Sequence, residues 1–222
     1  MGRPRTPKGR ARLVAQRLAE EYPGPADQLC ALHHDSPFQL LAATILSAQC
    51  TDVRVNLVTP ALFAAYPDAA ALARANPEDV EEIVRTTGFF RAKTRSLIGM
   101  AQAVQERYAG VVPTELADLV TLPGVGRKTG NVLRSVDFNL PGLPVDTHVL
   151  RLSQRLGLTE TLTSTERADA VKVEHLLNSF IPGPERGVFS LRMILHGRAT
   201  CMARRPACDR CVMADFCPSA VR

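Results

Sequence analysis

The stretch Thr121-Leu-Pro-Gly-Val-Gly-Arg-Lys-Thr129 decides how this chain of 222 residues is interpreted. It lies between two predicted helices, residues 114–120 and 127–137, and Gly124 and Gly126 can adopt a positive φ without a side-chain clash. The free N–H groups at the start of the second helix form a natural phosphate site, and such contacts hold nucleic acid without reading its sequence. A tight turn between two packed helices has the same residues, so both interpretations stay open. The glycine spacing fits neither the dinucleotide nor the P-loop fingerprint.

The rest of the chain also predicts helices. Ser36-Pro37-Phe38-Gln39 has the pattern of a capping box with proline at the first helical position, and the apolar run that follows predicts a buried helix. Further helices are predicted over residues 10–22, from Val53 behind the cap Asp52, after Asp68, after Asn76-Pro77, and over residues 91–108, 147–156, 166–180 and 185–197. No segment shows sustained period-two alternation, so we predict an all-α fold.

Basic side chains gather at both ends of the chain. Residues 1–12 hold five basic side chains and no acid, and residues 186–222 hold seven arginines against two aspartates. The formal net charge is +5. Basic clusters of this kind indicate a polyanionic partner such as nucleic acid. The N-terminal cluster is equally consistent with a solvated arm.

The hydrophobic pattern predicts neither a membrane span nor a secretory signal. The longest apolar stretch, Phe38–Ala48, is interrupted by polar residues and is shorter than the roughly 20 residues that cross a bilayer. Met1 is followed by Gly-Arg-Pro-Arg rather than by an apolar segment. We therefore expect a cytoplasmic protein.

Four of the six cysteines lie close together near the C-terminus, with the spacing C-x6-C-x2-C-x5-C: Cys201, Cys208, Cys211 and Cys217. Disulfides are rare in cytosolic proteins, so this segment indicates a metal site. Zinc bound by four thiolates remains an alternative, although a cubane cluster suits the two wide spans slightly better. Cys30 and Cys50 lie in apolar stretches and are interpreted as buried packing residues.

Four parts of the sequence together resemble the endonuclease III family of DNA glycosylases. They are Ile45-Leu-Ser-Ala-Gln-Cys-Thr-Asp52, Leu122–Thr129, Val145-Asp-Thr-His-Val149 and the four-cysteine segment, which follow one another in the family order. The helix-hairpin-helix motif alone is widespread. Its combination with Lys128, Asp146 and the cysteine spacing is highly specific.

The resemblance implies two α-helical lobes with DNA bound across the cleft between them. A six-helix lobe would comprise residues 30–140, with the helix-hairpin-helix motif at about residues 114–137. The other lobe would combine residues 1–29 with residues 141–222 and hold a [4Fe-4S] cluster in the loop 201–217. It is the resemblance, and not the spacing, that favours the cluster over zinc.

The resemblance also implies an activity: bifunctional DNA glycosylase and AP lyase in base excision repair. The expected partner is double-stranded DNA with oxidised pyrimidines or abasic sites, and the protein is expected to be a nucleoid-associated monomer. Lys128 matches the family's nucleophile, which forms a Schiff base and cleaves the strand by β-elimination. Asp146 matches the catalytic aspartate, although its place before a helix also fits an N-cap.

The same resemblance implies the DNA-contacting residues. Gln49 matches the residue that fills the gap left by an expelled nucleotide, and Phe89 falls where the family has an apolar wedge. The hairpin contributes the remaining DNA-binding residues, which are Leu122, Gly124, Val125, Gly126 and Arg127. Cys50, the pair Phe89-Phe90, and Gly130, where the family more often has alanine, depart from the family pattern.

Two other functions remain open at this level. An adenine mismatch glycosylase is related in fold but lacks the nucleophilic lysine, so Lys128 argues against it. A non-catalytic DNA-binding iron–sulfur protein would leave the pair Lys128 and Asp146 as a coincidence. Borohydride trapping on an abasic duplex separates these functions.

Overall fold

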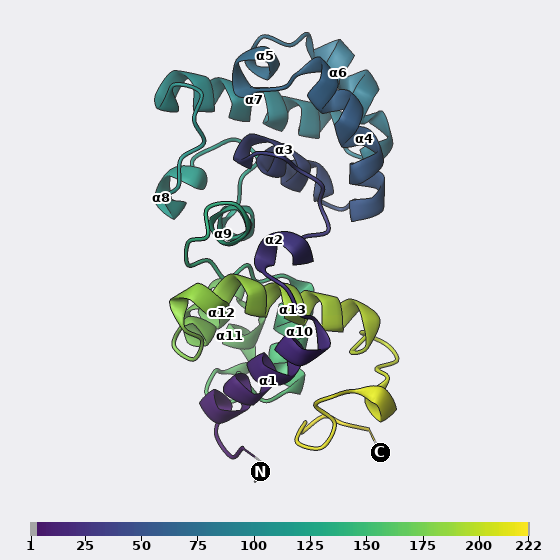
Figure 1. Ribbon diagram of the computed structural model, residues 1–222, viewed down its shortest axis with the longest axis vertical. Helices are drawn as coiled ribbons and strands as arrows, with labels where there is room; N and C mark the ends of the chain where they lie inside the picture. The colour runs from purple at the N-terminus through teal and green to yellow at the C-terminus, as the bar shows by residue number, and fades with distance from the viewer. Residues whose placement is uncertain (1–3, 222) are drawn as a thin grey trace. The chain divides into compact units, whose positions relative to one another are not determined.

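The computed structural model describes residues 4–221, and within this range the chain forms helices and no strand. The all-α prediction is therefore confirmed. The chain divides into two compact units: unit 1 combines Met1–Leu29 with Leu140–Arg222, and unit 2 is Cys30–Asn139 (Figure 1). Arg3, part of the basic N-terminal cluster, lies outside the described residues.

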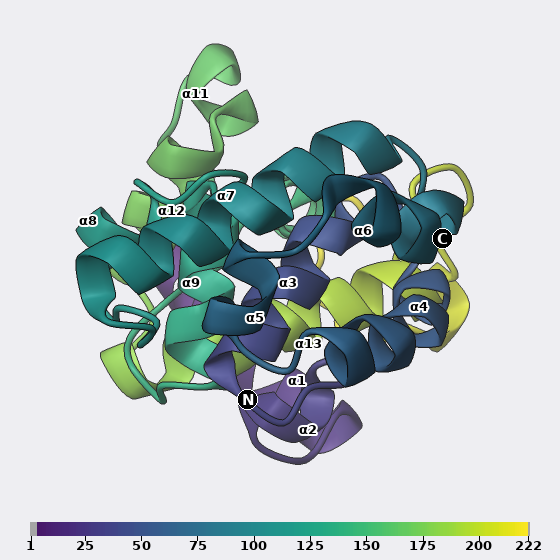
Figure 2. The same ribbon diagram turned by 90° about the horizontal axis from the view of Figure 1, so that it is seen from above.

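In unit 2, other helices pack around the apolar helix α3. Its helices are α3 (Pro37–Ser47), α4 (Asp52–Ala65), α5 (Ala69–Ala73), α6 (Pro77–Val84), α7 (Phe90–Tyr108), α8 (Leu116–Leu119) and α9 (Arg127–Val136), with the 3-10 turn η1 (Arg85–Thr87). This is one α-helix more than the six expected. Helices α4, α7 and α9 pack against α3 (Figures 1 and 2), so most of its side chains are buried, as the apolar run predicts.

Local capping signals set several helix starts in unit 2. The Ser36 hydroxyl accepts from the amide of Gln39, and Asp68 and Asn76 cap α5 and α6. The Gln39 side chain accepts from the amide of Asp35 rather than from that of Ser36, so the capping box is not closed in its usual form. The N-cap of α4 is Thr51 and not Asp52, because the Thr51 hydroxyl accepts a hydrogen bond from the amide of Arg54.

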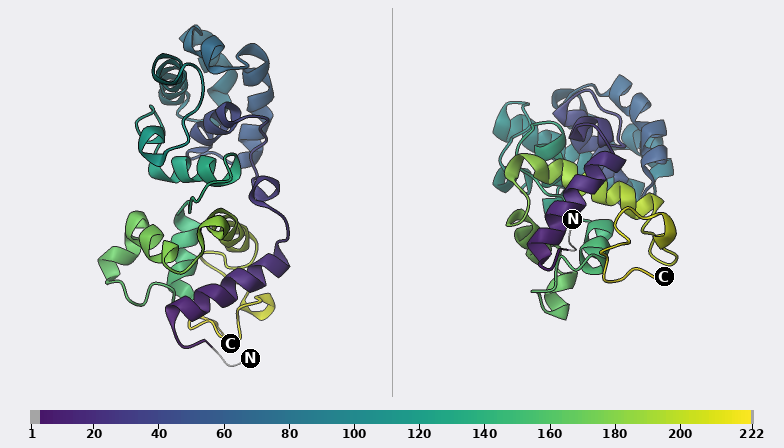
Figure 3. Two further views of the ribbon diagram at one scale, coloured as in Figure 1. Left: turned by 60° about the vertical axis from the view of Figure 1, so that its left-hand side comes forward. Right: turned by 60° about the horizontal axis from the view of Figure 1, so that its bottom comes forward.

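Unit 1 is built on α13 (Arg186–Ala199). It packs against α1 (Pro7–Glu21), α2 (Ala26–Leu29) and α10 (Thr147–Arg155), and the remaining elements are α11 (Ser164–Ala168), α12 (Ala170–Asn178), η2 (Gly183–Glu185) and η3 (Cys208–Arg210). The first helix and the C-terminal segment lie side by side (Figure 3). Arg17 of α1 pairs with Asp215 and lies 5.1 Å over the ring of Phe216, and Phe216 joins the apolar core of this unit.

The predicted boundaries of the helix over residues 166–180 are wrong. A capping box of Thr163 and Glu166 starts α11 earlier, and Asp169 then separates α11 from α12. Asp169 has extended backbone (φ −83°, ψ 111°), and its carboxylate accepts from the amides of Val171 and Lys172. A short polar side chain here offers the backbone an alternative to a continuous helix.

The basic N-terminal cluster is partly incorporated into unit 1. Residues from Pro7 onward belong to α1, and Arg10 donates to the carbonyl of Gly157 and pairs with Glu160. Only 12% of the Arg10 side chain is exposed. This arginine therefore fastens α1 to the loop after α10 and is not part of a free arm.

Among the described residues, no helix combines the length and the apolar character that crossing a membrane requires.

Candidate functional site

The predicted hairpin is formed by α8, a seven-residue turn (residues 120–126) and α9. Gly124 has φ +76°, and a Cβ at this position would come within 2.7 Å of the Cβ of Ser96, so the turn needs glycine for both conformation and space. Leu122 and Val125 are buried. Their side chains anchor the turn to the unit, so only their main-chain atoms are available to a ligand.

The first turn of α9 is the exposed end of this hairpin. Gly126 is the N-cap and provides no side-chain acceptor, so the leading amides of α9 are not satisfied by a capping side chain. Gly126, Arg127 and Lys128 are exposed. N–H groups that no capping side chain occupies and the positive end of a helix dipole form a site for an anion such as a backbone phosphate.

Gly130 lets α8 approach α9 closely. A Cβ on Gly130 would lie 2.6 Å from Cδ1 of Leu116 and 3.5 Å from Cβ of Leu119. Cδ1 of Leu116 is the end of a flexible side chain, and the distance to Cβ of Leu119 is an ordinary van der Waals contact. A Cβ at Gly130 would therefore require the end of the Leu116 side chain to move.

Lys128 is exposed in the first turn of α9 in unit 2. Within residues 4–221 its amine makes neither a hydrogen bond nor an ion pair. Its charge acts on the thiol of Cys30, but its three donors remain available to a substrate.

Asp146 is the N-cap of α10 in unit 1. Its Oδ1 accepts from the amides of His148 and Val149, at 2.8 Å and 2.9 Å. The predicted capping role is thus present. Among the described residues Oδ2 makes no hydrogen bond, so the second oxygen of this half-buried carboxylate remains available.

Gln49 and Phe89, both in unit 2, have left-handed backbone conformations. Their φ angles are 53° and 49°, which cost non-glycine residues about 1 kcal/mol or more. Both side chains are exposed, and Phe89 is 67% exposed. A large aromatic side chain at a strained, exposed position is unfavourable in the free protein, and such strain often marks a functional position.

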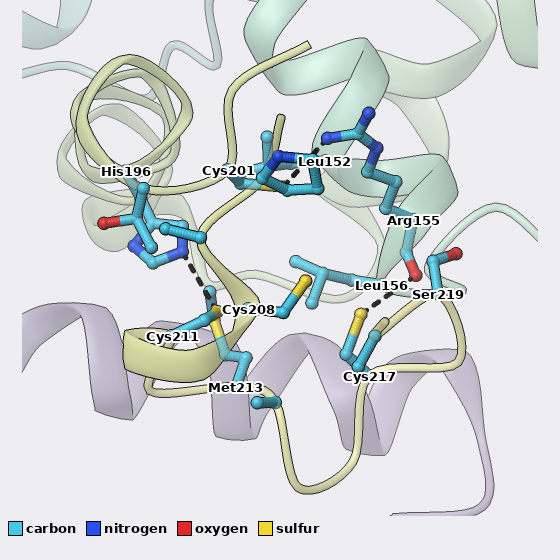
Figure 4. Close-up of a pocket in the computed structure, with 15 residues that line it drawn as sticks. Leu152, Arg155, Leu156, His196, Cys201, Cys208, Cys211, Met213, Cys217 and Ser219 are labelled. Atoms are coloured by element: carbon cyan, nitrogen blue, oxygen red, sulfur yellow. Dashed lines mark hydrogen bonds between the residues drawn. The ribbon is translucent and has the colours of Figure 1, made fainter. Parts of the chain in front are cut away.

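The four C-terminal cysteines line one cavity in unit 1 (Figure 4). The cavity has a volume of about 30 Å³, and its apolar walls come from Leu152 and Leu156 of α10 and from Met213. In Figure 4 the sulfur of Cys208 points into the space between the sulfurs of Cys211 and Cys217. Residues from Cys201 to Cys217 thus fold around a common centre.

Burial raises the pKa of the Cys211 thiol to about 11, and the other three cysteines add to this rise because thiolates repel one another. Burial is also the main reason why the pKa of Cys217 is raised. Four thiolates in one apolar cavity therefore need a cation to stabilise them. Metal binding has to displace their protons.

The donor set and the cavity fit an iron–sulfur cluster. The volume of about 30 Å³ is about twice what one water molecule needs. In the part of the chain that the structure describes, no three Cys, His, Asp or Glu side chains are placed to hold a single metal ion. Four thiolates around a space larger than one ion suit a cubane core, with each cysteine bound to one iron.

Sequence reasoning missed the side chains that surround these cysteines. Arg155 donates to Sγ of Cys201 at 3.4 Å and to the carbonyls of Met202 and Ala203. Arg151, one turn earlier on α10, donates to the carbonyl of Cys201. Their i, i+4 spacing was the available signal, because it places both arginines on one face of the helix.

His196 links α1 to the cluster loop. Its Nδ1 lies 2.9 Å from Oε2 of Glu21, and its Nε2 lies 3.3 Å from Sγ of Cys211. The imidazole is fully buried, and burial lowers the pKa of His196 while Glu21 opposes that change. No sequence motif identified this histidine, because Glu21 and Cys211 are far from it in the sequence.

Cys30 and Cys50, expected to be buried packing residues, are half-buried in unit 2. Burial raises the pKa of the Cys30 thiol.

The helix-hairpin-helix, the exposed lysine and the four-cysteine cavity define a class of DNA repair protein. Residues 42–180 match the family model of the HhH-GPD superfamily of base excision DNA repair proteins. Residues 201–217 match the iron–sulfur binding domain of endonuclease III.

Comparison with individual proteins narrows the family assignment within this superfamily. The chain is 49% identical to endonuclease III of Synechocystis over 96% of this chain and 94% of that protein. It is 36% identical to endonuclease III of Escherichia coli K12 over 92% of each. A solved non-covalent endonuclease III–DNA complex is 37% identical, covers 96% of both chains and superposes with a TM-score of 0.87.

The chain belongs to the endonuclease III family. It is a DNA N-glycosylase and AP lyase of base excision repair, it binds DNA, and it carries a [4Fe-4S] cluster. These findings exclude the non-catalytic alternative.

Proposed function

We propose that this enzyme removes oxidised pyrimidines from double-stranded DNA and cleaves the resulting abasic strand, with Lys128 as the nucleophile. The observation that carries the proposal is the exposed amine of Lys128, which makes no hydrogen bond or ion pair among the described residues, beside the N-terminus of α9. A phosphate bound at that helix end would place the adjacent sugar near the amine.

The chemistry proceeds in two steps. The Nζ atom of Lys128 attacks C1′ of the damaged nucleotide, and the base leaves with the electron pair of the glycosidic bond and takes up a proton. The resulting amine loses its proton as the sugar ring opens to a Schiff base. Removal of a C2′ proton then expels the 3′ phosphate, which breaks the strand on the 3′ side, and water releases the lysine.

Asp146 has a separate role in this proposal. Its Oδ1 holds the start of α10, while the carboxylate charge stabilises the positive charge that develops on the sugar as the base leaves. Cleavage of a site that is already abasic needs no base to be expelled. It should therefore depend less on Asp146.

Gln49 and Phe89 would open the duplex. A base inside a duplex has to be turned out before an enzyme can reach it, at a cost of a few kcal/mol in unstacking. Phe89 is exposed and can stack against neighbouring bases, and the amide of Gln49 can occupy the vacated position. The amides of Gly126 and Arg127 would bind the backbone without reading the sequence.

The four cysteines would hold the cluster, which would supply cross-links that order the loop 201–217. Because that loop carries the exposed Arg204 and Arg205, it presents a basic surface to DNA. We further propose that the enzyme acts as a monomer in the cytoplasm, associated with the nucleoid. Its similarity to bacterial relatives supports this placement.

Borohydride trapping on an abasic duplex tests the proposal. The wild-type protein should form a covalent complex, whereas Lys128→Ala should form none and still bind the duplex. Lys172→Ala is a matched control, because Lys172 is also an exposed lysine in the first turn of a helix. Undiminished trapping by Lys128→Ala would show that another amine is the nucleophile.

A further inference from the structure

Lys93 is a buried lysine that the proposed chemistry does not use. It lies in the first turn of α7 and is 5% exposed. Among the described residues no carboxylate pairs with it, and its Nζ donates to the main-chain oxygen of Thr87 at 2.7 Å. Burial lowers the pKa of Lys93, and Cys50 is the neighbour that opposes this. Burying an amine without a counter-charge is costly, so this position needs a physical reason.

The acceptor of this bond ends the turn that leads to Phe89. Thr87 is the last residue of η1, and it is followed by Gly88 (φ 72°) and Phe89 (φ 49°). Its hydroxyl donates to the carbonyl of Val84 at 2.8 Å. A cation at the C-terminal end of a helical segment satisfies the last carbonyls and is favoured by the dipole.

The side chain of Lys93 therefore spans the strained turn. It bonds to Thr87 on one side of Phe89, while its own amide donates to the carbonyl of Phe89 at 3.1 Å. These two bonds close the chain on itself around Gly88 and Phe89. The exposed side chain of Phe89 is thus carried by a turn whose backbone is held by two hydrogen bonds from Lys93.

The second strained residue, Gln49, directly precedes an electrostatic neighbour of the same amine. Cys50, which follows Gln49, is near enough to Lys93 to interact with it electrostatically. Its amide donates to the carbonyl of Ser47 at 3.0 Å, which forms the turn containing Gln49. Helices α3 and α7, which carry the two turns, pack against each other. Lys93 thus contacts the Phe89 turn directly and interacts electrostatically with Cys50 of the Gln49 turn.

We propose that Lys93 is a positioning residue whose ammonium holds the Thr87 carbonyl and keeps the Phe89 turn, beside the Gln49 turn, in the geometry that opens DNA. This inference rests on the proposed function, in which Phe89 and Gln49 enter the duplex. Lys93 itself does not touch the substrate.

The test measures base unstacking directly. A duplex carries a non-cleavable tetrahydrofuran abasic site, with 2-aminopurine in the opposite strand, which becomes fluorescent when it is unstacked. Lys93→Met keeps the length and apolar character of the side chain but removes the donor. It should reduce the fluorescence rise on this duplex, and the single-turnover excision rate on a separate thymine glycol duplex, by about 10- to 100-fold, because small misplacements cost this much. The melting temperature should stay within a few degrees of wild type.

Three further variants make the result specific. Lys172→Met makes the same substitution at an exposed lysine of unit 1 and should behave as wild type. Lys93→Arg keeps a cation with N–H donors and should recover most of the signal. In a Phe89→Ala background, Lys93→Met should cause little further loss, because both changes act on one turn. If Lys93→Met does not fold, Lys93→Gln replaces it, since it keeps a polar group but shortens its reach.

The outcomes separate this inference from its premise. A wild-type protein that neither unstacks 2-aminopurine nor excises a base overturns the proposed function and this inference together. If wild type is active and Lys93→Met unstacks equally well, the inference alone is overturned. Full additivity with Phe89→Ala would also overturn it, because Lys93 would then act elsewhere.

Discussion

Substitutions of Asp146 can separate its capping role from its catalytic role. In the structure Oδ1 alone caps two amides of α10. Asp146→Ala removes this acceptor and should cost about 1 kcal/mol, which lowers the melting temperature of a chain of this size by about 2–4 °C. Asp146→Asn keeps an oxygen in the same place and should lower it less.

The catalytic role predicts a different ranking. Both variants lose the negative charge, so both should slow base excision by about 10²–10³, the effect of one electrostatic group at a reacting centre. An asparagine that folds like wild type and yet excises slowly would locate the defect in the chemistry. Cleavage of an abasic duplex should be less impaired, because no base has to leave.

Asp169 provides a matched control on α12 of the same unit. Its Oδ1 caps the amides of Val171 and Lys172 at 2.8 Å and 3.2 Å, so Asp169→Ala should lower the melting temperature by a similar amount without slowing excision. Single-turnover rates on thymine glycol and abasic duplexes, with thermal melts, decide the matter. If Asp146→Asn excises at the wild-type rate, the catalytic assignment is refuted and Asp146 is only a cap.

Three other predictions follow from the same structure. Cys208→Ser removes one of the four thiolates, so the purified protein should lose its iron and its visible absorbance; a colourless wild-type protein that binds zinc instead would contradict this. Replacing Arg204 and Arg205 with alanine should lower the log–log salt slope of DNA binding by about 0.9 for each lost phosphate contact, and an unchanged slope would exclude this surface. Burial raises the pKa of Asp137, so the native state binds its proton more tightly than the unfolded chain and loses stability as the pH rises above about 4. Asp137→Asn should therefore gain melting temperature relative to wild type as the pH rises above about 4, and a pH-independent difference would refute this.

Signals that act within a few residues were read correctly from the sequence. The caps Ser36, Asp68 and Asn76 start helices where they were expected, because their side chains bond to amides two or three residues later. The four clustered cysteines indicated a metal site for a similar reason, since a short segment can fold around one centre. The resemblance to a family identified the cluster type and the activity, and both are confirmed. The roles of Lys128 and Asp146 stay predictions.

The errors in the predicted helix boundaries arose where local signals compete. The sequence predicts one helix over residues 166–180, but the Asp169 carboxylate accepts from the amides of Val171 and Lys172 and divides the segment. The short helix Ala26–Leu29 was missed because four residues carry no periodic pattern. Such short elements depend on packing against the rest of the unit.

The sequence by itself determined the helical class, several helix starts and the chemistry of the cysteine segment, because caps, periodicity and ligand spacing are local properties of the chain. Only the tertiary structure decided which side chains are buried and what they contact. It buried Leu122 and Val125 under the hairpin, and it brought Arg155 to the sulfur of Cys201. It also placed a lysine where water is excluded, under the turn that carries Phe89. Contacts of this kind join residues from different elements. Removing their polar groups from water costs free energy, and only the packing and hydrogen bonds of the folded unit offset that cost.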